Sequence, residues 1–234
     1  MLELVDVRSG YGRTAVLHGV SLSVDAGAGV GVIGRNGVGK STLLRTIVGQ
    51  IPLTGGRIGF EGRDISRRPV HARARGGIAY VPQGRQIFPS LSVLDNLRVA
   101  AYATRRSGWK EALEEIWREF PLLGAKRNDA GGSLSGGQQQ ILAVARALMT
   151  EPRLLLLDEP SEGVQPSIVD EIAVIVRRLN RERGITVILV EQNLDFATRV
   201  VDRAHLMDKG QIVRDLPAAD VLSDRALQHE YLGV

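Results

Sequence analysis

The stretch Gly34-Arg35-Asn36-Gly37-Val38-Gly39-Lys40-Ser41, with Thr42 next, decides how this 234-residue chain is interpreted. It fits the pattern G-x-x-x-x-G-K-[ST]. Its glycines let the backbone coil tightly, so that several N–H groups can turn toward one anion. The apolar run Gly29–Ile33 before it predicts a buried strand, and Lys40–Val48 after it predicts a helix that ends at Gly49. The loop is therefore expected at a helix N-terminus, which favours a phosphate group.

Two side chains of this loop have the chemistry that a nucleotide requires. Lys40 can reach β- and γ-phosphates, and the Ser41 hydroxyl can bind Mg²⁺. The alternative is a glycine-rich turn in which a lysine fell by chance, and the strand before the loop and the helix after it argue against that. We predict an ATP site on residues 34–42.

A second motif ends another buried strand. The apolar run Leu154–Leu157 is followed directly by Asp158 and Glu159. Ligands bind at the carboxyl ends of the strands in open α/β sheets. We expect Asp158 to hold Mg²⁺ through its water shell and Glu159 to activate the attacking water as a general base. Alone, the motif would more often be a strand followed by a charged turn at Pro160.

A third motif, Leu134-Ser135-Gly136-Gly137-Gln138, opens the predicted helix Gln138–Met149. Ser135 is a favourable N-cap, and the two glycines leave backbone N–H groups exposed at the helix start. The sequence thus predicts a second anion site, separate from the first, although an ordinary capped helix would need no more than Ser-Gly-Gly.

Strands and helices alternate over most of the chain, which predicts an α/β fold with a parallel sheet. The stretch from about 90 to 150 is all helical and interrupts this alternation. Expected strands are Leu2–Val7, Leu17–Val24, Gly29–Ile33, Arg57–Phe60 after a turn at Thr54–Gly56, Ile78–Val81, Leu154–Leu157, Thr186–Val190, Arg203–Met207 and Gln211–Val213. Expected helices are Lys40–Val48, Val93–Ala103, Lys110–Phe120, Gln138–Met149, Pro166–Arg183, Leu194–Val200 and Ala218–Tyr231.

Composition narrows the class of protein. Hydrophobic residues make up 44% of the chain and cysteine is absent, so we expect a sizeable core with no disulfide and no thiolate metal site. No apolar run approaches the roughly 20 residues of a membrane span, so a cytoplasmic protein is expected. The formal charge is +4. The densest basic cluster, Arg67-Arg68 with Arg73 and Arg75, has no aromatic residues among it, and we interpret it as solvated surface rather than a nucleic-acid site.

Together the three motifs, in this order, resemble the ATP-binding-cassette (ABC) family over essentially the whole chain. The resemblance implies a P-loop NTPase with a RecA-like core, a small antiparallel β subdomain and a helical subdomain. We place the core at residues 1–86 and 151–234 and the helical subdomain at 87–150. It also implies a head-to-tail dimer, in which each ATP lies between one P-loop and the other subunit's Ser135, Gly136, Gly137 and Gln138.

Further roles are carried over from the resemblance. Tyr11 stands where an aromatic ring stacks on adenine, and Gln83 stands where a glutamine contacts Mg²⁺ or the attacking water. The loop Ser161–Val164 occupies a segment that crosses the dimer interface. The family usually has a histidine near the γ-phosphate after the last core strand. Here Gln192 takes that place, and it can donate a hydrogen bond but cannot carry a proton charge.

The subfamily follows from shorter stretches. Leu189–Asn193, the P-loop and Glu230-Tyr231-Leu232-Gly233 resemble the ATPases of branched-chain amino acid importers and of their urea and short-amide relatives. Val81–Arg85 and Glu162–Ser167 are slightly more similar to the urea and amide branch.

The resemblance implies an ATPase subunit of an importer, peripheral on the cytoplasmic face of the inner membrane. Expected partners are separate membrane permeases, a second ABC ATPase subunit or a copy of this chain, and indirectly an extracytoplasmic solute-binding protein. The region Gly84–Leu97, with Phe88, is a candidate groove for a permease helix, or simply a loop into the helical subdomain. Two alternatives are a nucleic-acid- or ribosome-linked ABC ATPase and a non-hydrolysing nucleotide switch.

Overall fold

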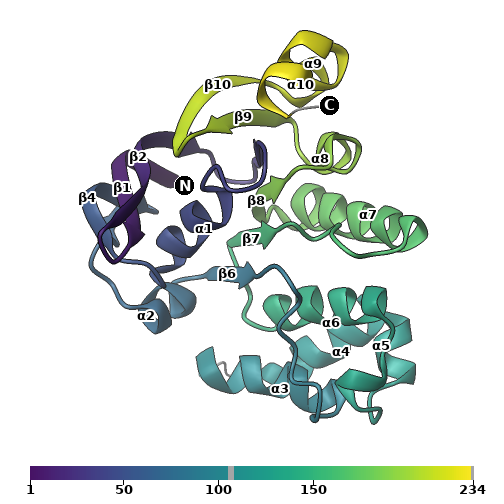
Figure 1. Ribbon diagram of the computed structural model, residues 1–234. Helices are drawn as coiled ribbons and strands as arrows, with labels where there is room; N and C mark the ends of the chain where they lie inside the picture. Colours follow the sequence, from purple (N-terminus) through teal and green to yellow (C-terminus); the bar gives the residue numbers. More distant parts are fainter. Residues whose placement is uncertain (105–107, 233–234) are drawn as a thin grey trace.

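A computed structural model describes residues 1–104 and 108–232. Gly233, one of the residues in the C-terminal resemblance, lies outside this range. The described chain forms two sheets with helix α1 (Lys40–Val48) packed between them, and further helices cover the outer face of the larger sheet (Figure 1). The predicted α/β architecture is confirmed.

The larger sheet has the strand order β10-β9-β3-β8-β7-β6, and only its edge strand β10 is antiparallel. Strand β7, which lies next to the edge strand β6, is buried on both faces. Leu154 and Leu156 pack toward α1, whereas Leu155 and Leu157 pack toward the outer helices, which explains an uninterrupted apolar run. The strands are β3 (Gly29–Ile33), β6 (Ile78–Val81), β7 (Leu154–Asp158), β8 (Thr186–Glu191), β9 (Arg203–Asp208) and β10 (Gln211–Pro217).

The smaller sheet is antiparallel, with the order β2-β1-β4-β5. The predicted turn at Thr54–Gly56 is wrong, because these residues lie inside strand β4. A shift of register between β1 and β4 replaces the turn: Asp6 and Gly56 have φ angles of 48° and 80°, and a Cβ on Gly56 would lie 2.2 Å from the Asp6 carbonyl oxygen. The strands are β1 (Leu2–Tyr11), β2 (Thr14–Val24), β4 (Leu53–Phe60) and β5 (Arg63–Asp64).

The remaining helices differ from the prediction near the C-terminus and in several short helices. The predicted helix Ala218–Tyr231 is two helices, because Asp224 leaves the helical conformation and its carboxylate accepts from the backbone N–H groups of Ala226 and Leu227. Two short helices, α2 and α5, were not predicted. The helices are α2 (Val70–Arg75), α3 (Val93–Thr104), α4 (Trp109–Glu119), α5 (Pro121–Ala125), η1 (Gly131–Ser133), α6 (Gly136–Leu148), α7 (Pro166–Arg183), α8 (Leu194–Val200), α9 (Ala218–Ser223) and α10 (Arg225–Tyr231).

Helices α3 to α6 lie together at one end of the molecule (Figure 1). Within the described residues, no helix combines the length and apolar character needed to cross a bilayer.

The sequence analysis expected the basic cluster near residue 70 to be solvated surface, and for Arg73 this expectation is wrong. Arg73 is buried, and its guanidinium donates to the carbonyl oxygens of Thr46, Ile47, Ser66 and Arg68 at 2.7–2.9 Å. Two of these carbonyls belong to the last turn of α1, where a cation is favoured. Arg73 therefore fixes α2 against the end of the helix that begins at the P-loop.

Replacing Arg73 by Met should lower the free energy of unfolding by about 3 kcal/mol, because four carbonyl groups lose a charged donor. Urea unfolding monitored by circular dichroism measures the change. Arg75→Met, in the same helix but exposed, is the matched control and should change it by less than about 0.5 kcal/mol. Equal effects of the two substitutions would contradict the role of Arg73.

Candidate functional site

The parallel strands bring the first two motifs to one edge of the sheet. The P-loop follows β3, and Asp158 and Glu159 end β7, with β8 hydrogen-bonded between the two strands. Ile33 is in register with Glu191, and Asp158 with Val190, so these residues lie at one level. A cleft of about 380 Å³ opens there. It is lined by Tyr11, Val16, Asn36, Gly37, Gly39, Lys40, Ser41, Thr42, Gln83 and Glu159.

Two glycines of the P-loop are required by the geometry. Gly39 has a φ of 110°, which L side chains rarely adopt. A Cβ on Gly34 would lie 2.4 Å from the carbonyl oxygen of Met207, so a side chain there would push the loop off strand β9. These constraints shape the turn that leads into α1.

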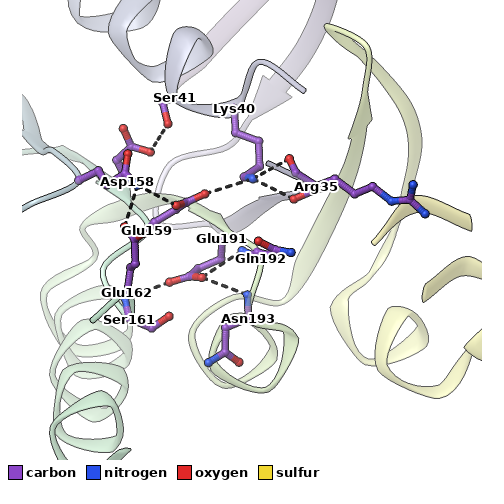
Figure 2. A network of polar contacts seen from close by, with 12 residues as sticks. Arg35, Lys40, Ser41, Asp158, Glu159, Ser161, Glu162, Glu191, Gln192 and Asn193 are labelled. Carbon is purple, nitrogen blue, oxygen red and sulfur yellow. Dashed lines mark hydrogen bonds and ion pairs between the residues drawn. The ribbon is translucent and has the colours of Figure 1, made fainter. Parts of the chain in front are cut away.

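Lys40 occupies the centre of the loop. Its ammonium group donates to the carbonyl oxygens of Gly34 and Arg35 at 2.8 and 3.0 Å and lies 3.2 Å from Glu159 Oε1 (Figure 2). The side chain is 3% exposed, so its charge is satisfied by the loop and by Glu159. A phosphate group bound in the cleft would meet a cation that is already positioned.

Asp158 and Ser41 provide the oxygen atoms that could bind a metal ion. Asp158 is buried, and its Oδ1 accepts a hydrogen bond from the Ser41 hydroxyl at 2.8 Å. Among the described residues no group of three or more His or acidic side chains is arranged to hold a metal ion alone. One hydroxyl beside one carboxylate nevertheless fits Mg²⁺, which keeps several waters and binds nucleotide phosphates in place of further protein ligands.

The sequence analysis missed Tyr80, whose hydroxyl donates to the second oxygen of Asp158, Oδ2, at 2.8 Å. Burial, with the Asp158 carboxylate adding to it, raises the pKa of Tyr80 above its ordinary value, so the phenol stays protonated and donates. Hydrogen bonding to Tyr80 raises the pKa of Arg45. The only signal for this role in the sequence was a polar-tipped residue in the short buried strand Ile78–Val81.

Glu159 leaves the strand in a left-handed conformation, with a φ of 48°, and its N–H donates to the Val190 carbonyl oxygen at 2.9 Å. This conformation is uncommon for a residue with a side chain, and it turns the carboxylate toward Lys40. Gln83 lies in the cleft as predicted, but its amide donates to Glu159 and Glu162 at 3.2 and 2.7 Å. Its contact with Mg²⁺ stays a prediction.

Glu191 holds two loops at the back of the site. Its buried carboxylate accepts from the backbone N–H groups of Ser161, Gln192 and Asn193 at 3.0–3.1 Å (Figure 2). Burial raises the pKa of Glu191, and the three hydrogen bonds act in the opposite direction. The Gln192 side chain is exposed and has no hydrogen-bond partner among the described residues, so its contact with a γ-phosphate also stays a prediction.

Other predicted residues are placed differently. Tyr11 lines the cleft with 49% of its surface exposed, and its hydroxyl accepts from Arg45 at 3.4 Å. Arg35 contributes its backbone to the loop, but its side chain points away and donates to the His229 carbonyl oxygen in α10 (Figure 2). Val38 belongs to the loop but does not line the cleft.

The third motif forms a capping box at the start of α6. Ser135 Oγ accepts from the Gln138 N–H at 3.3 Å, and Gln138 Oε1 accepts from the Ser135 N–H at 3.1 Å. Ser135, Gly136 and Gly137 do not line the cleft at the P-loop, and their part in a second anion site stays a prediction. The guanidinium of Arg85, also missed from the sequence, bridges Gln139 of α6 and the carbonyl oxygen of Gly163.

Comparison with known proteins gives a consistent result. Residues 17–162 match the ABC transporter family. The chain is 40% identical over 233 residues to the high-affinity branched-chain amino acid transport ATP-binding protein BraG of Pseudomonas aeruginosa, with 100% of both chains covered. It is 33% identical to a probable branched-chain amino acid transport ATP-binding protein, LivF, of Archaeoglobus fulgidus, covering 100% of this chain and 99% of the relative. It is 37% identical to the lipopolysaccharide export system ATP-binding protein LptB of Escherichia coli K12, covering 99% and 97%.

Solved structures agree. The ADP conformation of the ATP-binding cassette MJ1267 superposes with a TM-score of 0.87 at 30% identity, covering 100% of this chain and 99% of the other. A dimeric post-hydrolysis state of the cassette MJ0796, bound to ADP and Pi, gives a TM-score of 0.83 at 26% identity, covering 93% and 99%.

Lys40→Ala should weaken ATP binding by about 10- to 100-fold, because charge-assisted contacts to the phosphates are lost. Titration with a fluorescent ATP analogue measures the dissociation constant directly. Lys110→Ala, which removes an exposed lysine in α4, is the control and should bind as the unchanged protein does. An unaltered dissociation constant in Lys40→Ala would refute the assignment of the P-loop.

Proposed function

Because this chain belongs to the ATP-binding-cassette transporter family, we propose that it is the ATP-hydrolysing subunit of an importer for branched-chain amino acids. The observation that carries the ATPase function is the joint placement of Lys40, Ser41 and Glu159 around one cleft at the carboxyl edge of the parallel sheet. Asp158 is hydrogen-bonded to Ser41 beside it. The full-length relatives named for branched-chain amino acid transport support the solute class.

The chain's residues divide the chemistry among themselves. The P-loop N–H groups and Lys40 bind the phosphates, and Ser41 and Asp158 would hold Mg²⁺, which neutralises charge on the β- and γ-phosphates. Glu159 orients an attacking water and accepts its proton. Glu159 is also paired with Lys40, and its carboxylate would leave this ion pair to act on the water. Gln192 would donate a neutral hydrogen bond to the γ-phosphate.

The working unit is a dimer in this proposal. Ser135, Gly136 and Gly137 form an anion site that is not part of their own chain's cleft, so they are suited to close the cleft of a second subunit. The dimeric ADP- and Pi-bound relative supports this arrangement. Tyr11, exposed at the cleft mouth, would stack on adenine.

A groove between the core and the α3–α6 region suits a permease helix. It has a volume of about 260 Å³ and is lined mainly by apolar residues of α1, α2, β6, α3 and α6, together with Arg73 and Arg146. Arg146 also donates to the Gln86 carbonyl oxygen and lies 5.3 Å from the Phe88 ring centroid. The segment Gly84–Leu97, predicted to receive the permease, therefore adjoins this groove. Docking there would place the protein peripherally on the cytoplasmic face of the membrane.

Two other solute classes follow from specific observations. The loop residues Val81–Arg85 and Glu162–Ser167 favour urea or short amides, and that remains a prediction. The lipopolysaccharide-export relative, at 37% identity, favours an exporter as the second candidate.

Glu159→Gln should reduce the turnover number for ATP by about 10²- to 10⁴-fold while leaving ATP affinity nearly unchanged, because the amide cannot accept the water's proton. Phosphate release gives the turnover number, and gel filtration with ATP reports whether dimers accumulate. Glu171→Gln, an exposed carboxylate in α7, is the control. Turnover near the unchanged rate in Glu159→Gln would remove this residue from the mechanism.

Purification of the membrane complex from the native host tests the assembly. We expect two permeases, this chain and a different ABC ATPase, because importers of this type combine two cassettes, and uptake of radiolabelled leucine should depend on the complex. Recovery of two copies of this chain with no second cassette would refute the hetero-pair. If loss of the complex instead left leucine uptake unchanged and caused lipopolysaccharide to be retained in the cell, the exporter would be favoured.

A further inference from the structure

Tyr80 reaches the nucleotide site from the neighbouring strand. Strand β6 runs parallel to β7, with Tyr80 in register with Leu156, and its half-buried side chain extends along the sheet edge to Asp158. The phenol hydroxyl donates to Asp158 Oδ2 at 2.8 Å. The contact joins two side chains of the protein itself and involves no substrate atom.

Both oxygens of the Asp158 carboxylate are thereby held from different directions. Ser41 Oγ donates to Oδ1 at 2.8 Å, and Tyr80 donates to Oδ2. Asp158 is only 1% exposed, so water cannot substitute freely for either donor. When Mg²⁺ arrives, Ser41 is expected to turn its oxygen lone pairs to the metal, whereas Tyr80 can keep its hydrogen bond. Of the two donors, only Tyr80 can fix the carboxylate in both states.

We infer that Tyr80 is a positioning residue for the metal site: its hydroxyl holds the Asp158 carboxylate in the orientation that binds the Mg²⁺ of the nucleotide. This inference rests on the proposed function, because it needs a metal–nucleotide complex in the cleft. Hydrogen-bond partners of metal-binding carboxylates commonly set metal affinity.

The position of the Tyr80 ring gives the contact a second consequence. The ring lines the groove that we assign to a permease helix, while the hydroxyl touches Asp158. One side chain thus spans the wall between the groove and the metal site. Whatever fills the groove packs against the residue that orients Asp158.

A tyrosine that served only packing would be replaced by phenylalanine without loss, so Tyr80→Phe separates the two roles. The affinity of Mn²⁺ for the ADP-bound protein, measured by electron paramagnetic resonance, should fall about 10-fold in this variant. The affinity for ADP in EDTA should be unchanged, because the Tyr80 hydroxyl donates to Asp158 and, among the described residues, makes no hydrogen bond to residues 34–42. Tyr102→Phe is the matched control, since it removes a hydroxyl that, among the described residues, hydrogen-bonds to Arg98 in α3.

A double-mutant cycle with Asp158→Asn assigns the effect. Tyr80→Phe should then cause no further loss of Mn²⁺ affinity, because the carboxylate that it orients is gone. Unchanged Mn²⁺ affinity in folded Tyr80→Phe, or equal losses in both backgrounds, would overturn the inference. Failure of the unchanged protein to bind Mn²⁺ with ADP would instead contradict the proposed function.

A measurement without substitution at Tyr80 covers the case in which Tyr80→Phe does not fold. The chain has four tyrosines, so 3-fluorotyrosine labelling gives four ¹⁹F resonances, and Tyr→Phe variants at the other three positions assign them. Adding Mg²⁺ to the ADP-bound protein should shift the Tyr80 resonance and leave that of Tyr102 in place. A Tyr80 resonance that does not respond to Mg²⁺ would refute the positioning role.

Discussion

The parallel register of β3, β8 and β7 is the constraint on which the site depends. It sets the end of β3 level with Glu191, and Asp158 level with Val190, so the loop after one strand meets the acids that end another. Three acidic residues, Asp158, Glu159 and Glu191, then lie at one sheet edge where burial would be costly for unpaired charges. Each carboxylate has its own donors. Asp158 accepts from Ser41 and Tyr80, and Glu159 is contacted by Lys40 and Gln83. Glu191 accepts from three backbone N–H groups.

Asp158, Glu159 and Glu191 differ in their hydrogen-bond partners, and each set of partners suits the role proposed for that residue. Asp158 is buried and held at both oxygens, as a carboxylate that must present a fixed orientation to a metal ion. Glu159 is paired with the Lys40 ammonium group and with a glutamine amide, so it can be released when a phosphate takes over Lys40. Glu191 accepts from three backbone N–H groups and has a structural role: it ties the segment after Glu159 to the segment after β8.

The sequence predicted the fold and the P-loop because both depend on local patterns: uninterrupted apolar strands, helix periodicity, and glycines at fixed spacing. It failed where a tertiary contact overrides a local signal. Thr54–Gly56 has the composition of a turn but lies in a strand, at a register shift opposite Asp6. Arg73 is charged and would be expected in solvent, but it is buried and donates to the last carbonyl groups of α1. Tyr80 could not be found from the sequence, because its importance comes from the strand next to it.

The second anion site predicted at the start of α6 would explain why the proposed ATPase activity belongs to an assembly. A cleft open to solvent around Lys40 admits water as readily as phosphate, and electrostatic stabilisation of a transferring phosphoryl group strengthens when water is excluded. The N-terminus of α6, capped by Ser135, does not line its own chain's cleft. In the proposed dimer, closing one subunit's α6 over another subunit's P-loop would exclude water and bring the predicted anion site to the phosphate. Because the groove lies between α6 and the β6 strand that carries Tyr80, a partner seated there contacts the element that closes and the side chain that orients Asp158. Closure of the dimer and organisation of the metal site would then respond to the same docking event.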